Sequence, residues 1–148
     1  MKTHKKNQTS GHHKDLSIYI HIPFCEIICP YCDFNKYSKV DDLIPNFIQS
    51  LISEIQRNSK RFADSKIVSI SLGGGTPSYI NNKDLMAIFN SLKNNYFIDN
   101  KFEFSIEVNP ADINNLRLEL YEKIGINRVS VGGQSFNKNI LSKLGRNH

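Results

Sequence analysis

Residues 18–35 read IYIHIPFCEIICPYCDFN and join a strand pattern to a short cysteine loop. Ile18, Ile20 and Ile22 alternate with Tyr19 and His21, which is the two-residue period of a β-strand. Three cysteines follow within eight residues, namely Cys25, Cys29 and Cys32. The stretch therefore predicts a strand that carries three thiols in the loop at its carboxyl end.

These cysteines are the only ones in the chain, and an odd, tightly clustered set is a poor disulfide framework. Thiolates are soft ligands that suit iron–sulfur clusters and zinc. Three protein ligands on a four-iron cluster leave one iron open to a small molecule. The alternative is a structural zinc site completed by His21. Zinc would leave the glycine run at 73–75 and Glu107 without an explanation.

Beyond the loop, the apolar residues alternate between a helical and a strand period. Strands are expected at 18–22, 66–72, 102–108 and 129–131. Helices are expected at 41–55, 85–92 and 113–124, and a fourth begins near Asn137. This order predicts an α/β fold with a parallel sheet and helical crossovers, built from about four β/α units.

The phase of the strands predicts two different sheet faces. The apolar set is expected to face the helices: Ile18, Ile20, Val68, Ile70, Phe104, Ile106, Val129 and Val131. The opposite set is mostly polar: Tyr19, His21, Ser69, Ser71, Ser105, Glu107, Arg128 and Ser130. A doubly wound sheet is apolar on both faces. One polar face instead predicts a curved, partial (β/α) barrel with a hydrophilic interior that holds a polar ligand.

Chemically distinctive segments follow each strand. The cysteines come after the first strand and Gly73–Pro77 after the second, Glu107 closes the third, and Gln134 follows the fourth. Ligands of α/β barrels bind at the carboxyl ends of the strands. We therefore expect these four segments to converge on one site.

Composition is consistent with one folded domain, because 39% of the 148 residues are hydrophobic and 22% are charged. We expect residues 1–15 to be a disordered basic tail and 16–148 to form the domain. No apolar run is long enough to cross a bilayer and no targeting pattern is found, so a cytoplasmic location is expected. The net charge of +5 comes from scattered lysines, which does not favour nucleic-acid binding.

Taken in order, the cysteine spacing, GGGTP after the second strand and a strand-ending Glu resemble the radical SAM superfamily. Finer strings resemble its oxygen-independent coproporphyrinogen III oxidase group: YIHIPFC, YCDFN, LGGGTPS, IEVNP, GINRVSVGGQSF and LGRNH. The matches run from about Leu16 to His148. The resemblance implies that 16–148 is the N-terminal part of a radical SAM core, a partial (β/α) barrel.

The same resemblance implies roles for individual residues. Cys25, Cys29 and Cys32 would ligate a [4Fe-4S] cluster, and S-adenosylmethionine (SAM) would chelate the open iron. The residues implied to contact SAM are Tyr19, Tyr31, Gly74, Gly75, Thr76, Glu107, Gln134 and Arg146. Reductive cleavage of SAM would give a radical that abstracts hydrogen, while the protein orients SAM and excludes solvent.

Phe34 bears on the choice between two branches of that group. The oxidases carry a further cysteine two positions after the third, whereas Phe34 resembles the heme-chaperone branch, HemW. A chaperone role makes heme a candidate ligand, with His12, His13 and His21 as candidate donors. An oxidase of heme biosynthesis, or an inactive fragment of either protein, remains the alternative.

The chain also departs from the family pattern. Relatives of this kind are more than twice as long, with about six strands and a C-terminal domain. We therefore expect an uncovered fourth strand, poor solubility, and either a second chain that completes the fold or a fragment. Gly133 stands where the family usually carries a branched apolar residue, which predicts a loss of packing.

Overall fold

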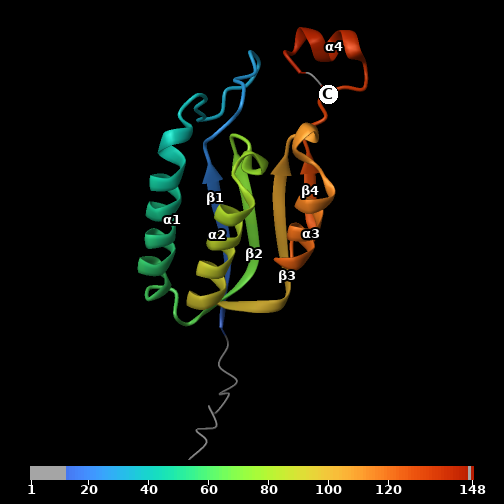
Figure 1. Ribbon diagram of the computed structural model, residues 1–148. Helices are drawn as coiled ribbons and strands as arrows, with labels where there is room; N and C mark the ends of the chain where they lie inside the picture. The colour runs from blue at the N-terminus through green and yellow to red at the C-terminus, as the bar shows by residue number, and fades with distance from the viewer. Residues whose placement is uncertain (1–12, 147) are drawn as a thin grey trace, which may run out of the picture.

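The computed structural model describes residues 13–146 and 148. Its four strands form one parallel sheet, and helices lie against one side of this sheet (Figure 1). The strands are β1 (Lys14–Ile22), β2 (Ser65–Gly74), β3 (Phe97–Val108) and β4 (Arg128–Val131). The helices are α1 (Ile44–Ser59), α2 (Asn82–Asn95), α3 (Asn115–Lys123) and α4 (Lys138–Lys143). Three 3-10 turns complete the order: η1 (Asp41–Leu43), η2 (Pro77–Tyr79) and η3 (Pro110–Asp112).

The strands lie in the order β1-β2-β3-β4, and every neighbouring pair is parallel. Successive right-handed crossovers in this order leave the helices on the same face. The predicted α/β fold with helical crossovers is therefore confirmed. Helix α4 is the exception, because it lies above the carboxyl ends of the strands (Figure 1).

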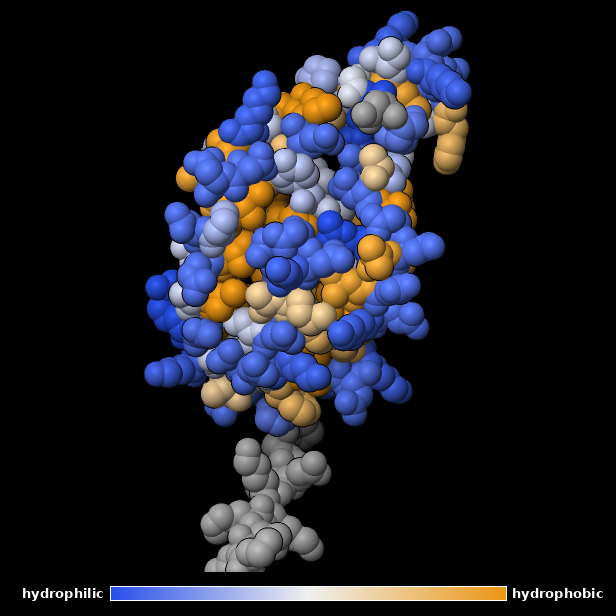
Figure 2. Space-filling model, viewed as in Figure 1, coloured by the Kyte–Doolittle hydropathy of each residue, from blue (hydrophilic) through white to orange (hydrophobic). Residues whose placement is uncertain are grey.

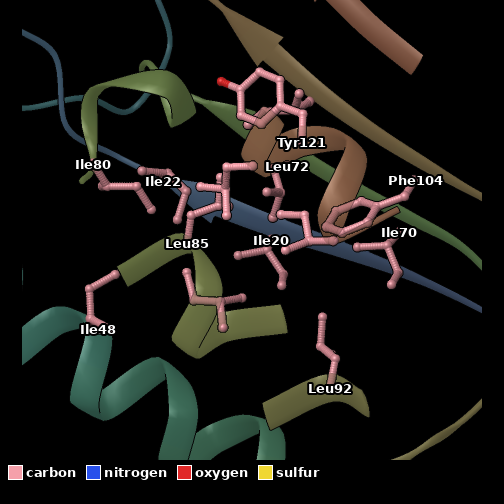
Figure 3. Packing of buried hydrophobic residues seen from close by; sticks show 14 of the residues in the cluster. Ile20, Ile22, Ile48, Ile70, Leu72, Ile80, Leu85, Leu92, Phe104 and Tyr121 are labelled. Atoms are coloured by element: carbon pink, nitrogen blue, oxygen red, sulfur yellow. The ribbon is translucent and has the colours of Figure 1, made fainter. Parts of the chain in front are cut away.

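The core lies between the sheet and the helices. In Figure 3, apolar side chains of the strands meet those of α1 and α2: Ile20, Ile22, Ile70, Leu72 and Phe104 from the sheet, and Ile48, Leu85 and Leu92 from the helices. All of them are buried. Figure 2 shows hydrophilic side chains over most of the helical face, with apolar ones visible between them. Packing of this face holds the strands in register and so positions the loops at their carboxyl ends.

The opposite face of the sheet is polar, as the strand phase predicts. Tyr19 is exposed beside buried Ile20, and Glu107 is exposed beside buried Ile106 and Val108. Hydroxyl groups also pair across the strands on this face: Ser69 with Ser17, and Ser105 with Ser71. The sheet therefore presents one apolar and one hydrophilic surface.

The phase prediction is wrong at Val68. A register shift between Ile67 and Ser69 interrupts the pairing of β2 with β3. Ile67 and Ile70 are both fully buried although they are three residues apart, while Val68 is half-buried. A bulge inserts one extra residue and so reverses the facing of the residues before it.

Strand β4 is exposed on the face expected to be apolar. Val129 is 39% exposed and Val131 is 52% exposed, which confirms the expectation of an uncovered fourth strand. At the other end of the chain, β1 begins at Lys14, inside the stretch expected to be a tail. Lys66 contacts the Asp15 carboxylate at 3.6 Å, so an ion pair accompanies this early strand pairing. The rest of that stretch, 1–12, lies outside the described residues.

Within the described residues, none of the helices has the length and apolar character to cross a membrane.

Candidate cofactor-binding site

The loops that follow the strands enclose a cavity of about 580 Å³ at the carboxyl edge of the sheet. Ten of the eleven predicted site residues line it: Cys25, Cys29, Tyr31, Cys32, Gly74, Gly75, Thr76, Glu107, Gln134 and Arg146. The cavity therefore receives residues from the segments after all four strands. The expected convergence is found.

The cysteine loop is held in place by backbone hydrogen bonds at its base. Tyr37 donates its N–H to the Pro23 carbonyl at 2.7 Å, and Cys25 donates to the Tyr37 carbonyl at 2.9 Å. The ammonium of Lys36 donates to the carbonyls of Cys32 and Phe34. The loop thus has a closed base before any ligand is added.

The three thiols are free, with Cys25 buried and Cys29 and Cys32 half-buried. Burial raises the pKa of the Cys25 thiol, while a hydrogen bond from the Thr76 hydroxyl, 3.3 Å from the sulfur, lowers it. The neighbouring Cys32 and Cys29 raise this pKa further. A metal centre supplies the positive charge that a buried thiolate needs, so the donor set fits one.

The three thiols come from one loop, and thiolates suit an iron–sulfur cluster as well as zinc. A structural zinc ion would need a fourth protein donor beside them, for which the sequence offers His21.

His21 is occupied by other contacts. Its Nε2 lies 2.8 Å from the Asn35 carbonyl, which can only accept, so Nε2 carries the proton. Nδ1 is then free to accept from the Tyr19 hydroxyl at 3.2 Å. Both ring nitrogens are engaged, which disfavours His21 as a zinc or heme donor. His13 stacks on Phe97 at 5.3 Å, next to the start of β1, and His12 lies outside the described residues.

The space beside Gly74 and Gly75 is already occupied by residues of β1 and of the loop that follows it. Gly74 has φ of +110°, and a Cβ there would lie 2.6 Å from the His21 ring. A Cβ on Gly75 would lie 2.8 Å from the backbone of Pro23. These glycines therefore allow β2 to pack against the base of the cysteine loop, a constraint that the expectation of close SAM approach did not include.

Tyr19 is the predicted site residue that does not line the cavity. It lies on the polar face, where a Cβ on Gly73 would be 3.0 Å from its ring and 3.3 Å from the Glu107 carboxyl carbon. Burial, and secondarily the Glu107 charge, raises the pKa of Tyr19. Glu107 itself accepts the Gly74 N–H at 3.3 Å.

Arg146 links the cysteine loop to the loops that follow β3 and β4. Its Nη1 lies 3.6 Å from the Cys29 sulfur, and its Nη2 donates to Asn109 Oδ1 at 3.0 Å and to the Gly132 carbonyl at 2.8 Å. Sequence reasoning did not single out Asn109 or Lys36 as site residues, although both line the cavity. Asn109 lies in the IEVNP string, which was the available signal.

The segment after β4 contains Gly133 and Gln134. Gln134 has φ of 60°, in the left-handed region, while it lines the cavity. A Cβ on Gly133 would have open space around it, with no neighbour within 4 Å, so the loss of packing expected from this glycine stays a prediction.

Comparison with known proteins gives a consistent result. A family model described as "Radical SAM superfamily" matches residues 19–148. The chain is 38% identical over 138 residues to the "Heme chaperone HemW" of Haemophilus influenzae, covering 90% of this chain and 36% of that protein. It is 34% identical to an "Oxygen-independent coproporphyrinogen III oxidase" of Salmonella typhimurium, covering 90% and 29%.

A solved structure is similar as well. The coproporphyrinogen III oxidase of Escherichia coli, described as a radical SAM enzyme, superposes with a TM-score of 0.85 at 31% identity. The match covers 92% of this chain and 31% of that one. The chain thus spans about a third of the length of the relatives it matches.

Proposed function

The chain belongs to the radical SAM superfamily, and on that premise we propose that it binds a [4Fe-4S] cluster through Cys25, Cys29 and Cys32 and holds SAM beside it. The single observation that carries the proposal is the common cavity lined by these thiols and by segments following the other strands. When bound and reduced, the cluster would supply the electron that cleaves SAM.

The residues of the chain would bind and orient the cofactor. The Cys25 thiolate would keep the Thr76 hydroxyl as a hydrogen-bond donor, at the 3.3 Å contact found here. Glu107 and Gln134 would offer polar groups to SAM, while the Arg146 guanidinium would contribute positive charge beside Cys29. The loops would exclude bulk water from the cavity.

At the level of the whole protein, we propose a heme-chaperone role in porphyrin metabolism. Phe34 supports this role over the oxidase, because the resemblance places a further cysteine at this position in oxidases. Phe34 lines the cavity and is 64% exposed, so an apolar side chain stands there. Heme is then the proposed second ligand, and a cytoplasmic location fits this role.

The test is anaerobic reconstitution of the chain with iron and sulfide, followed by iron analysis and a dithionite-driven assay for 5′-deoxyadenosine. About four irons per chain are expected. Cleavage of SAM would support enzymatic chemistry, whereas a cluster without cleavage would favour a binding role. Tightly bound zinc in place of iron would contradict the proposal.

Single replacements of each cysteine by serine sharpen this test. Each is expected to remove most of the iron and the visible absorbance, because the harder serine oxygen is a poor ligand for the cluster. Tyr37→Phe is the matched control in the same loop, since its side chain is exposed and its structural hydrogen bonds come from the backbone. Unchanged iron in all three serine variants would refute the assignment.

A further inference from the structure

Ser78 joins two of the loops that build the cavity, although it does not line the cavity itself. It lies in η2 and is 1% exposed. Its hydroxyl donates to Asp112 Oδ2 at 2.5 Å and accepts the Asn109 N–H at 3.0 Å. Its carbonyl accepts from Arg117 Nη2 at 3.1 Å. The loop after β2 is thereby fastened to the loop after β3.

Asn109 carries this connection to the cavity. The backbone N–H of Asn109 is held by Ser78, and its side-chain Oδ1 accepts from Arg146 Nη2 at 3.0 Å. The same guanidinium reaches the Cys29 sulfur through Nη1. Asn109 and Arg146 both line the cavity, so a shift of Asn109 would move the guanidinium within it.

We propose that Ser78 is a positioning residue for the cofactor site, which acts through Asn109 to orient the Arg146 guanidinium. The buried hydroxyl donates to the Asp112 carboxylate and accepts the Asn109 N–H, so its removal takes one hydrogen-bond partner from each of these groups. This inference depends on the proposed function only for the identity of the ligand, SAM.

Ser91 provides a matched control. It is also buried, at 6% exposure, but within the described part of the chain its hydroxyl has no hydrogen-bond partner. Ser91 lies in α2 and does not line the cavity. Ser91→Ala therefore removes the same atom from a similar environment without cutting a connection.

The first measurement is the affinity of the reconstituted chain for SAM by equilibrium dialysis. Ser78→Ala is expected to weaken binding about five- to tenfold, as the loss of one positioning hydrogen bond would. Ser78→Thr, which keeps a hydroxyl, should restore most of the affinity, and Ser91→Ala should leave it unchanged. Equal affinity of Ser78→Ala and Ser91→Ala would overturn the proposal.

A double-mutant cycle tests the route. In an Arg146→Lys background, Ser78→Ala should weaken SAM binding by less than about twofold more, because the path to the guanidinium is already altered. Independent, multiplicative losses would contradict action through Arg146. If Ser78→Ala fails to fold, Ser78→Cys, whose thiol is only a weak hydrogen-bonding group, takes its place in the cycle.

A readout without the cofactor separates this inference from the proposed function. The NMR signal of the Arg146 side-chain Nε–H should shift in the unloaded Ser78→Ala chain and stay in place in Ser91→Ala. If the wild-type chain takes up no SAM, the proposed function fails and this signal alone decides the role of Ser78. An unshifted signal in Ser78→Ala would overturn the positioning role.

Discussion

Gln134 stands in a backbone conformation that is costly for any residue except glycine. Its φ of 60° lies in the left-handed region, where a side chain costs about 1–2 kcal/mol. Residues kept in such a conformation cluster at binding sites, and Gln134 lines the cavity. The strain therefore supports a binding role for its amide.

Gln134→Gly should separate stability from binding. The substitution is expected to raise the free energy of unfolding by about 0.5–1 kcal/mol, because strain is relieved, and to weaken SAM binding by the reconstituted chain. Lys39→Gly is the control, since Lys39 has φ of 59°, is exposed and does not line the cavity. It should give a similar gain in urea unfolding without changing affinity. Unaltered SAM binding in Gln134→Gly would argue against the role of its amide.

Gly74→Ala should be much more damaging than Gly125→Ala. Both glycines have positive φ, but a Cβ on Gly74 meets the His21 ring at 2.6 Å, whereas one on Gly125 first meets Phe102 at 3.4 Å. We expect Gly74→Ala to cost about 2 kcal/mol more in urea unfolding, because only it adds a steric clash.

His21→Ala provides the rescue that identifies this clash. In the His21→Ala background, Gly74→Ala should cost about as much as Gly125→Ala, because the ring that met the new Cβ is gone. If the difference between the two glycines persists without the ring, the clash with His21 is not its cause.

The sequence could predict which residues reach the cavity more easily than how they contact one another. Spacing places Cys25, Cys29 and Cys32 at the end of the first strand, because every strand end in a parallel sheet faces the same edge. Contacts between side chains of different strands depend on register and rotamer, which spacing does not encode. The engagement of both His21 nitrogens and the Asn109–Arg146 contact were missed for that reason.

Among the secondary-structure elements, the order was predictable and the ends were not. The third strand was expected at 102–108 but begins at Phe97, because its early residues pair with β2 on the other side of a register shift. The alternating pattern identifies only the part of a strand that contacts the core. Polar strand ends and bulges follow from pairing with neighbours, which the local pattern does not contain.

The contact between η1 and η2 gives a pH-dependent prediction. The Tyr79 hydroxyl donates to Asp41 Oδ1 at 2.6 Å, and this bond, together with burial and the charge of Asp41, raises the pKa of Tyr79 to about 12. An unfolded tyrosine titrates near pH 10. The protonated hydroxyl therefore contributes its stability fully below pH 10, and this contribution is lost as the pH rises through 12.

Asp41→Asn should lower the pKa of Tyr79 toward 10, because the charged acceptor becomes neutral. The titration can be followed by NMR on tyrosine labelled with ¹³C at the ring carbon that bears the hydroxyl. Asp42→Asn changes the neighbouring carboxylate, which is not the partner of Tyr79, and should leave the titration of Tyr79 nearly unchanged. Equal shifts in both variants would mean that general charge, and not the hydrogen bond, sets this pKa.

At the scale of the whole molecule, one sheet serves two purposes. Its apolar face builds the core with the helices, while its polar face carries Tyr19 and also Glu107, which lines the cavity. This division explains why polar residues alternate along strands that pack so firmly on one side. It also leaves β4 as one of the two edge strands of the sheet, and its exposed valines suit pairing with another chain.

The 148-residue chain is therefore expected to self-associate through β4 as its concentration rises. Val131→Lys should reduce this association, because a lysine on an edge strand opposes pairing with another strand. Ile140→Lys is the matched control: Ile140 is 48% exposed against 52% for Val131, but it lies on α4. Sedimentation velocity over a range of concentrations measures the effect. A wild-type chain that stays monomeric, or an equal reduction by both lysines, would show that the β4 edge does not drive association.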